Sequence, residues 1–428
     1  MTTSKELAAR YKAILPGYVT PLYEEPVSID RGEGSFVWDL EGNRYMDWFG
    51  GVLTTMVGHS QPEVVAAVQA QAAKVMHTST LYLSEPMIEL AEKIAAESGI
   101  PDAKVFFTTS GSEANDTALM LSTFFRKSNE VLAMRNSYHG RSFTTQAITS
   151  HRSWSNTAIS GLSVSFVQGP YKLRSPYREL DDEAFTQACV TDLVQVIDMM
   201  TAGDVACLIA EPIQGVGGFA TPPDGMFGAM KKVLDEHRIL FVSDEVQTGW
   251  GRTGEHFWGY QAHGIVPDML TFAKGVGNGI TLAGIVGRAE IMDVLPNLSF
   301  STFGGNPLSS AAGLATLKYV KDADLQGNAK ARGQQMQDRL APVVEETDWI
   351  AELRGRGLMQ AIETVHPDSI EPNVKAARML LEQTKERGLL IGKGGLYGNV
   401  LRLTPMLNIT EQEMDDGLDA LIAAIRAV

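Results

Sequence analysis

Short apolar runs alternate with longer amphipathic stretches through the middle of the chain. Four nearly continuous apolar runs lie at 105–109, 205–210, 239–243 and 269–273. Their length and continuity predict buried strands, and helical spacing of apolar residues covers 112–126 and 226–237 between some of them. Buried strands separated by helices are typical of an α/β fold in which a mostly parallel sheet carries helices on both faces.

The two ends of the chain follow a different pattern. Helical spacing and short strand-like runs alternate over 309–428, which predicts a smaller α+β domain. Residues 1–50 mix short helical and strand-like pieces, including a hairpin at 39–47, and we expect them to contribute to this smaller domain. The large domain then spans 51–308.

The composition of the chain excludes some kinds of binding partner and indicates a cellular location. The 428 residues include 36 Lys and Arg against 51 Asp and Glu, a formal charge of −15, which argues against nucleic acid and anionic membranes. The two cysteines fit no disulfide framework, and neither a signal peptide nor a membrane span is expected. A cytoplasmic protein is therefore predicted.

The end of the first predicted strand favours an anion. Ser110, Gly111 and Ser112 put small side chains and free backbone N–H groups at a helix N-terminus. Such a site suits a phosphate because the N–H groups and the helix dipole both favour negative charge. An ordinary helix N-cap is the alternative.

Two further strand ends carry ionisable side chains. Asp244 follows the strand at 239–243 as a poorly solvated carboxylate that needs a partner, or as a cap of the next loop. Glu245 points the other way if the strand continues, so one of the two acids is structural. Lys274 follows the strand at 269–273, where burial favours a neutral amine able to form a Schiff base. A rim lysine neutralised by Asp244 or Glu245 is the alternative.

A phosphate cradle, a carboxylate and a nucleophilic lysine are together the three functions that pyridoxal phosphate requires. Lys393 is the only other lysine in comparably Gly-rich surroundings, but it follows no equally clear strand. Nicotinamide chemistry is disfavoured because Gly275–Gly279 reads GxGxG rather than GxGxxG. A non-catalytic scaffold would not need both acid and lysine, and the histidines have no metal-ligand spacing, so no metal is expected.

At this point the sequence resembles the class III (ω-type) aminotransferases of fold type I, most of all the alanine–glyoxylate branch. The matching motifs are Thr109-Ser-Gly-Ser-Glu-Ala-Asn115, Ser137-Tyr-His-Gly140, Glu211-Pro-Ile-Gln-Gly215, Asp244-Glu-Val-Gln-Thr-Gly249, Ala273-Lys-Gly275 and Ser301-Thr-Phe-Gly-Gly-Asn-Pro307. They run in the family's order over nearly the whole chain. The resemblance implies an aminotransferase that uses pyridoxal 5'-phosphate and a small 2-oxo acid such as pyruvate, glyoxylate or 2-oxoglutarate.

Carried over by position, the resemblance implies that Lys274 forms the internal aldimine and that Asp244 pairs with the pyridine nitrogen. Gln247 would reach the ring hydroxyl and Tyr138 would stack on the ring. Glu211 matches an acid near the cofactor. His139 and Val246 are assigned to the cofactor by the same motifs.

The resemblance also implies a shared active site. Ser110, Gly111 and Ser112 would hold the phosphate, and Thr302 would reach the phosphate of the other subunit. If so, the protein is a homodimer, or a dimer of dimers, with sites completed across a two-fold interface.

On the substrate side, Arg402 matches the arginine that binds the substrate carboxylate; a surface salt bridge is the alternative. Val216 stands where ornithine- and GABA-type members carry a glutamate that pairs with this arginine, so Arg402 is expected to stay free. Trp48, Phe49 and Tyr82 match pocket positions or belong to the core. A lyase, an aminomutase or a racemase on the same scaffold is the alternative function.

Overall fold

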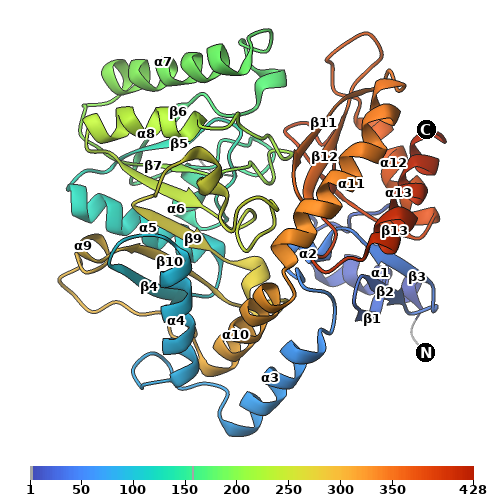
Figure 1. The fold of residues 1–428 in the computed structure, drawn as a ribbon, viewed down its shortest axis with the longest axis horizontal. Coiled ribbons are helices and arrows are strands. Elements are labelled where there is room, and N and C mark those ends of the chain that lie inside the picture. The colour runs from blue at the N-terminus through green and yellow to red at the C-terminus, as the bar shows by residue number, and fades with distance from the viewer. Residues whose placement is uncertain (1–2, 157–158) are drawn as a thin grey trace.

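The computed structural model describes residues 3–156 and 159–428. Its centre is a seven-stranded sheet in the order β4-β10-β9-β8-β7-β5-β6 (Figure 1). The strands are β4 (Ala103–Thr108), β5 (Glu130–Met134), β6 (Ser163–Val167), β7 (Val205–Ala210), β8 (Leu240–Asp244), β9 (Met269–Phe272) and β10 (Ala283–Arg288). Strand β10 alone runs opposite to the other six strands of this sheet. The predicted mostly parallel α/β fold is therefore confirmed.

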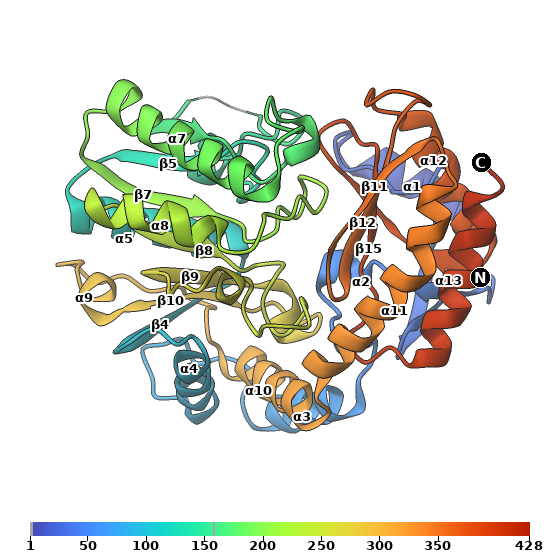
Figure 2. The same ribbon diagram turned by 45° about the horizontal axis from the view of Figure 1, so that its top comes forward.

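Helices cover both faces of this sheet because its strands are apolar on both sides. Leu208 of β7 joins a core cluster with helices α7 and α8, while its neighbours Cys207 and Ile209 join a cluster with α5. Successive strand residues point to opposite faces, which puts α5 on the other side of the sheet from α7 and α8 (Figure 2). The helices of this part are α3 (Pro62–Lys74), α4 (Glu85–Glu97), α5 (Gly111–Arg126), α6 (Phe143–Ala147), α7 (Asp182–Met200), α8 (Met226–Glu236), α9 (Ala289–Met292) and α10 (Pro307–Asp322).

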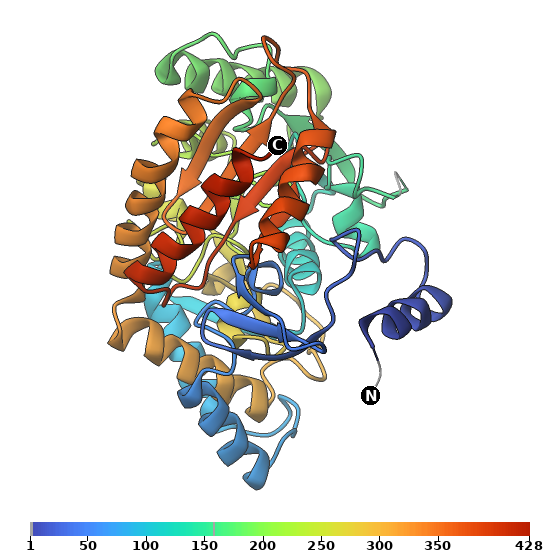
Figure 3. The ribbon, with the colours of Figure 1, turned by 90° about the vertical axis from the view of Figure 1, so that its right-hand side faces the viewer.

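A second sheet is built from the C-terminal part of the chain in the order β11-β12-β15-β14, with every pair antiparallel. It comprises β11 (Ile350–Arg356), β12 (Met359–Thr364), β14 (Gly392–Gly394) and β15 (Val400–Leu403). Helices α11 (Leu325–Glu345), α12 (Val374–Glu386) and α13 (Glu411–Ile425) cover its outer face (Figure 3), so the other face is turned towards the large sheet.

A third sheet joins the two ends of the chain. The hairpin β2 (Phe36–Asp39) and β3 (Arg44–Asp47) is flanked by β1 (Ile29–Glu33), and β3 pairs in parallel with β13 (Leu389–Leu390). Short helix α2 (Gly50–Leu53) leads back to the large sheet, whereas α1 (Ser4–Ile14) buries none of its residues and stands apart (Figure 3). The predicted contact of the N-terminal segment with the C-terminal part is thus present; the exact domain boundaries stay a prediction.

Among the described residues, no helix is both long and apolar enough to cross a membrane.

Candidate active site

A cavity of about 360 Å³ lies where the parallel strands of the large sheet end. Five strands, β4, β5, β7, β8 and β9, deliver residues to it, as expected of ligand sites in open α/β sheets. Every residue that the sequence assigned to the cofactor, except Thr302, lines this cavity. These are Ser110, Gly111, Ser112, Tyr138, His139, Glu211, Asp244, Val246, Gln247 and Lys274.

Lys274 follows β9 directly and has a φ of +52°, a conformation that costs a non-glycine residue about 1–3 kcal/mol. Burial lowers the pKa of its ammonium group to about 8 from an ordinary 10.5, and the charge of Arg402 acts in the same direction. Asp244 and Glu211 oppose this shift, yet within the described part of the chain Lys274 forms no ion pair. The cavity therefore presents an amine that is easily deprotonated.

Asp244, the last residue of β8, is buried and held by three donors. Its carboxylate accepts hydrogen bonds from Asn115 Nδ2 and His139 Nδ1, both at 2.8 Å, and from the backbone N–H of Val246 at 3.2 Å. Thr271 Oγ1 in turn donates to Asn115 Oδ1 at 2.7 Å. Asn115 is thus a site residue that sequence reasoning did not assign, although it ends the first of the matching motifs.

Glu245 has a structural role, which resolves the question of which acid serves the cavity. It is completely buried and accepts hydrogen bonds from Ser243 Oγ at 3.0 Å and from the backbone N–H groups of Gly259 and Tyr260 at 2.8 Å. Burial raises the pKa of Glu245. It stabilises the loop after β8, and Asp244 alone of the two faces the cavity.

The N-terminus of α5 is both capped and exposed to the cavity. Ser110 Oγ accepts from the backbone N–H of Glu113 at 3.2 Å, so the N-cap interpretation is correct for Ser110. Ser112 Oγ accepts from the backbone N–H of Arg141 at 2.9 Å. A Cβ on Gly140, whose φ is +139°, would lie 2.4 Å from Ser112 Oγ, so this close approach requires glycine.

Tyr138, Glu211 and Gln247 form the wall between the strand ends. The backbone N–H of Tyr138 donates to Glu211 at 3.0 Å, and the N–H of Gly215 donates to the other oxygen of Glu211 at 2.8 Å. Burial raises the pKa of Glu211 to about 7. The oxygen Oε1 of Gln247 is buried and has no hydrogen-bond donor in the described structure.

Arg402 lies on β15, outside the lining of this cavity but close enough to influence Lys274. It is 5% exposed, and its guanidinium carbon lies 5.0 Å from the Phe49 ring centre and 5.7 Å from that of Phe219. Its Nε and one terminal nitrogen have no acceptor, and it forms no ion pair with any described residue. Burial lowers the pKa of Arg402 to about 10. The surface-salt-bridge alternative is therefore wrong.

Besides Arg402 and Phe49, which packs beside it, three assigned residues do not line the cavity. Trp48 is completely buried, and its ring packs so closely on Gly417 of α13 that a Cβ there would lie 2.2 Å away, which makes Trp48 a core residue. Tyr82 is 69% exposed and Thr302 is also exposed, both on loops beyond the cavity of their own chain. No cluster of three or more potential metal ligands occurs among the described residues.

Comparisons with known proteins show the family to which the chain belongs. The model of the family described as "Aminotransferase class-III" matches residues 19–425. The chain is 36% identical to alanine–glyoxylate aminotransferase 2 homolog 2, mitochondrial, of Arabidopsis thaliana (97% of this chain, 86% of that protein) and 35% identical to a leucine/methionine racemase of Thermococcus litoralis (99% and 96%). A solved amine transaminase from an uncultivated Pseudomonas species, in its PLP-bound internal aldimine form, superposes with a TM-score of 0.90 at 29% identity (97% of this chain, 98% of that chain).

Proposed function

The chain belongs to the class III aminotransferase family of pyridoxal-phosphate enzymes, and we propose that Lys274 and Asp244 are its catalytic residues. It moves an amino group from an amino acid or amine donor to an oxo acid. The observation that carries the assignment is that one cavity contains Lys274, Asp244 and the N-terminus of α5.

The residues present fit pyridoxal phosphate. Two buried polar atoms in the cavity wall, Gln247 Oε1 and His139 Nε2, lack a partner in the described structure, as expected of groups that await a polar ligand. Lys274 would hold the aldehyde, Asp244 the pyridine nitrogen, and Gln247 the ring hydroxyl. The α5 N-terminus would hold the phosphate.

When bound, the cofactor supplies an aldehyde carbon for the amino group and a ring that takes up electrons. Lys274 Nζ, once displaced by the donor and in its neutral form, takes the proton from the amino-bearing carbon of the donor. Asp244 holds a proton at the ring nitrogen, and Asn115 and His139 fix the carboxylate in that position. Tyr138 would cover the ring and exclude water from it.

Arg402 would bind the substrate carboxylate through its two unpartnered nitrogens. Val216 offers no charge that competes for it, so Arg402 is available to donor and acceptor alike. We therefore propose that both substrates carry a carboxylate next to the amino or keto carbon, with pyruvate, glyoxylate or 2-oxoglutarate as acceptor. Phe49 would form part of the wall beside that carboxylate.

A donor-by-acceptor screen on cofactor-loaded protein tests this function. Transamination yields a keto product and pyridoxamine phosphate in the first half-reaction. A racemase, the activity of the Thermococcus relative, would instead interconvert the two enantiomers of an amino acid without net keto product. A lyase or an aminomutase would release an eliminated group or a rearranged amine.

We also propose a homodimer or a dimer of dimers in the cytosol. Thr302 is exposed, and Leu298, Phe300 and Phe303 beside it are large exposed apolar residues, as at an interface. Thr302 would complete the phosphate site of the partner. The two buried free cysteines suit a reducing compartment. Light scattering would measure the oligomeric state, and cell fractionation would test the cytosolic location.

A further inference from the structure

The unpaired guanidinium of Arg402 shares one face of the small sheet with a buried acid, Glu363. In the antiparallel pairing of β12 with β15, Ala361 lies opposite Arg402 and Glu363 lies opposite Val400. Glu363 and Arg402 are therefore diagonal neighbours on one face, an arrangement in which long side chains reach each other across about 7–8 Å. Glu363 is completely buried, so its carboxylate needs a cationic partner, yet it does not pair with Arg402.

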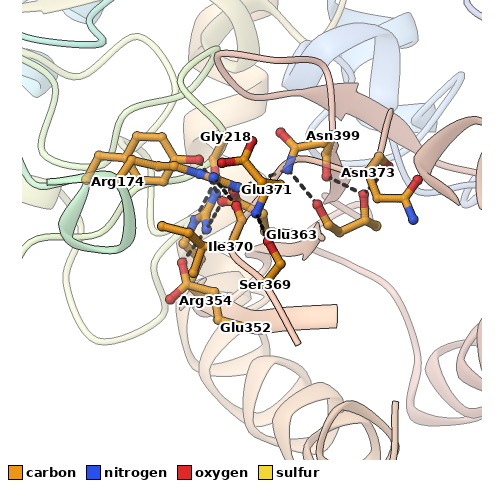
Figure 4. A network of polar contacts seen from close by, with 12 residues as sticks. Arg174, Gly218, Glu352, Arg354, Glu363, Ser369, Ile370, Glu371, Asn373 and Asn399 are labelled. Atoms are coloured by element: carbon orange, nitrogen blue, oxygen red, sulfur yellow. Dashed lines mark hydrogen bonds and ion pairs between the residues drawn. The ribbon is translucent and has the colours of Figure 1, made fainter. Parts of the chain in front are cut away.

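Glu363 is fully engaged by donors other than Arg402 (Figure 4). One carboxylate oxygen accepts from Arg174 Nε at 3.0 Å and from a terminal Arg174 nitrogen at 2.6 Å, and also from Asn399 Nδ2 at 3.2 Å. The other oxygen accepts from Arg354 at 2.6 Å and from the Tyr171 hydroxyl at 2.7 Å. Two guanidinium groups and two neutral donors thus occupy a single carboxylate.

The two arginines are themselves anchored away from Arg402. Arg354, on β11, also pairs with Glu352 and donates to the carbonyl of Gly218 at 2.8 Å. Arg174 lies in the 3₁₀ turn η1 (Lys172–Arg174) after β6, and it donates to the carbonyl of Ile370. Ala361 and Val400, the cross-strand partners of Arg402 and Glu363, belong to an apolar cluster with Phe219. Their other bonds therefore fix both arginines in positions from which they keep Glu363 away from Arg402.

We propose that Arg174 and Arg354 sequester Glu363 and thereby keep Arg402 free for the carboxylate of a 2-amino or 2-oxo acid. The inference rests on the proposed role of Arg402 and adds the reason that this arginine stays available. Arg174 is then a positioning residue that acts through Glu363 and does not itself contact substrate. If its charge is removed, Glu363 turns towards Arg402 and competes with the substrate.

Propionate, which has a carboxylate but no reacting group, is the probe for this competition. Calorimetric titration of the cofactor-loaded protein should give a dissociation constant for propionate at least about fivefold higher in Arg174→Gln than in the wild type. In Arg174→Gln/Glu363→Gln the constant should return to within about twofold of the wild type, because position 363 then has no charge to compete, while Glu211, whose charge also acts on Arg402, is the same in every variant. Arg339→Gln is the matched control, since Arg339 pairs with Asp415 and Asp419 on the far side of the sheet and should leave propionate binding unchanged.

A substrate pair gives a second measurement. In the first half-reaction the KM of L-alanine should rise in Arg174→Gln, whereas that of isopropylamine, which replaces the carboxylate by a methyl group, should not. Unchanged propionate binding in Arg174→Gln, or no recovery of propionate binding in the double variant, would overturn the proposal. The hydrogen bonds and ion pairs of Glu363 would then have only a structural role. Should Arg174→Gln fail to fold, Glu363→Gln alone decides: weaker propionate binding there contradicts sequestration.

Arg402→Gln separates the two levels of the argument. Loss of propionate binding in Arg402→Gln, together with wild-type binding in Arg174→Gln, would reject the sequestration and retain the role of Arg402. Wild-type binding in Arg402→Gln would reject the role of Arg402 itself.

Discussion

At the scale of single residues, the site depends on one lysine whose surroundings change its chemistry. Lys274→Ala should abolish transamination and the yellow absorbance of the bound cofactor, because Lys274 is the only lysine among the described residues that line the cavity. Lys393→Ala is the matched control: Lys393 is also partly buried but lies on β14, and its loss should preserve the absorbance band. A band that persists in Lys274→Ala would reject the assignment.

The lowered pKa of Lys274 predicts a specific pH dependence. Only the neutral amine attacks an aldehyde, so the rate at which cofactor-free protein captures pyridoxal phosphate should rise about tenfold per pH unit and level off above about pH 8. Stopped-flow absorbance measures this rate over pH 6–10, a range that extends about two pH units on either side of the pKa of Lys274. A rate that still rises about tenfold per unit up to pH 10 would mean that burial does not lower the pKa of Lys274.

Asp244 and Glu245 are adjacent in sequence but are expected to respond differently to loss of charge. Asp244→Asn should slow proton removal from the donor at least about a hundredfold while thermal stability changes little. Glu245→Gln should lower the melting temperature, because Glu245 anchors the N–H groups of Gly259 and Tyr260, but leave the rate per folded molecule near the wild type. Single-turnover kinetics and thermal melts separate the two effects.

How far such roles could be predicted depends on where the signal lies. Lys274 and Asp244 end continuous apolar runs, so the local pattern alone marked them as unusual. Asn115 sits inside a helical pattern, and its contact with Asp244 arises only when α5 packs against β8. The bonds to Glu363 likewise join residues up to 192 positions apart, and no local pattern encodes such a distance.

At the scale of elements, the junction of α5 with the loop before α6 should be sensitive to small changes in volume. Gly140→Ala would drive a Cβ against Ser112 and should weaken binding of pyridoxal phosphate at least about tenfold. Gly225→Ala is the matched control, since Gly225 also has a positive φ (+76°) but a Cβ added there would have no atom within 4 Å. It should cost about 1–2 kcal/mol of stability without changing cofactor affinity in a fluorescence titration. Equal cofactor affinity in both variants would contradict the role of this contact.

Two of the strands that the sequence analysis missed, β6 and β10, have weak local patterns, whereas β5 was missed although it is apolar and buried. Strands β7, β8 and β9 are buried on both faces and stand out as apolar runs. Strand β6 lies at the sheet edge and alternates serine with apolar residues, and β10 contains Gly284 and Gly287. Both form because neighbouring strands offer hydrogen bonds and packing, a tertiary effect that outweighs weak local propensity.

At the scale of the whole molecule, a shared active site predicts complementation between inactive subunits. Lys274→Ala lacks the amine, and Thr302→Ala should bind pyridoxal phosphate weakly. A mixed dimer has one site with both an intact lysine and an intact Thr302 from the other subunit. Co-refolding the two variants should therefore restore tight cofactor binding at that one site, measured by titration of the yellow absorbance of the bound cofactor. No recovery would argue for sites that are complete within one chain.

The pairing of β3 with β13 has a consequence for biosynthesis. Strand β3 ends at Asp47, and the segment that covers its edge, Leu389–Leu390, is not made until nine-tenths of the polypeptide has been synthesised. Through most of translation the N-terminal ribbon therefore has an open edge, the kind of surface that invites aggregation. We therefore expect the nascent chain to be prone to aggregation, and to benefit from chaperones, until Leu389–Leu390 pair with β3.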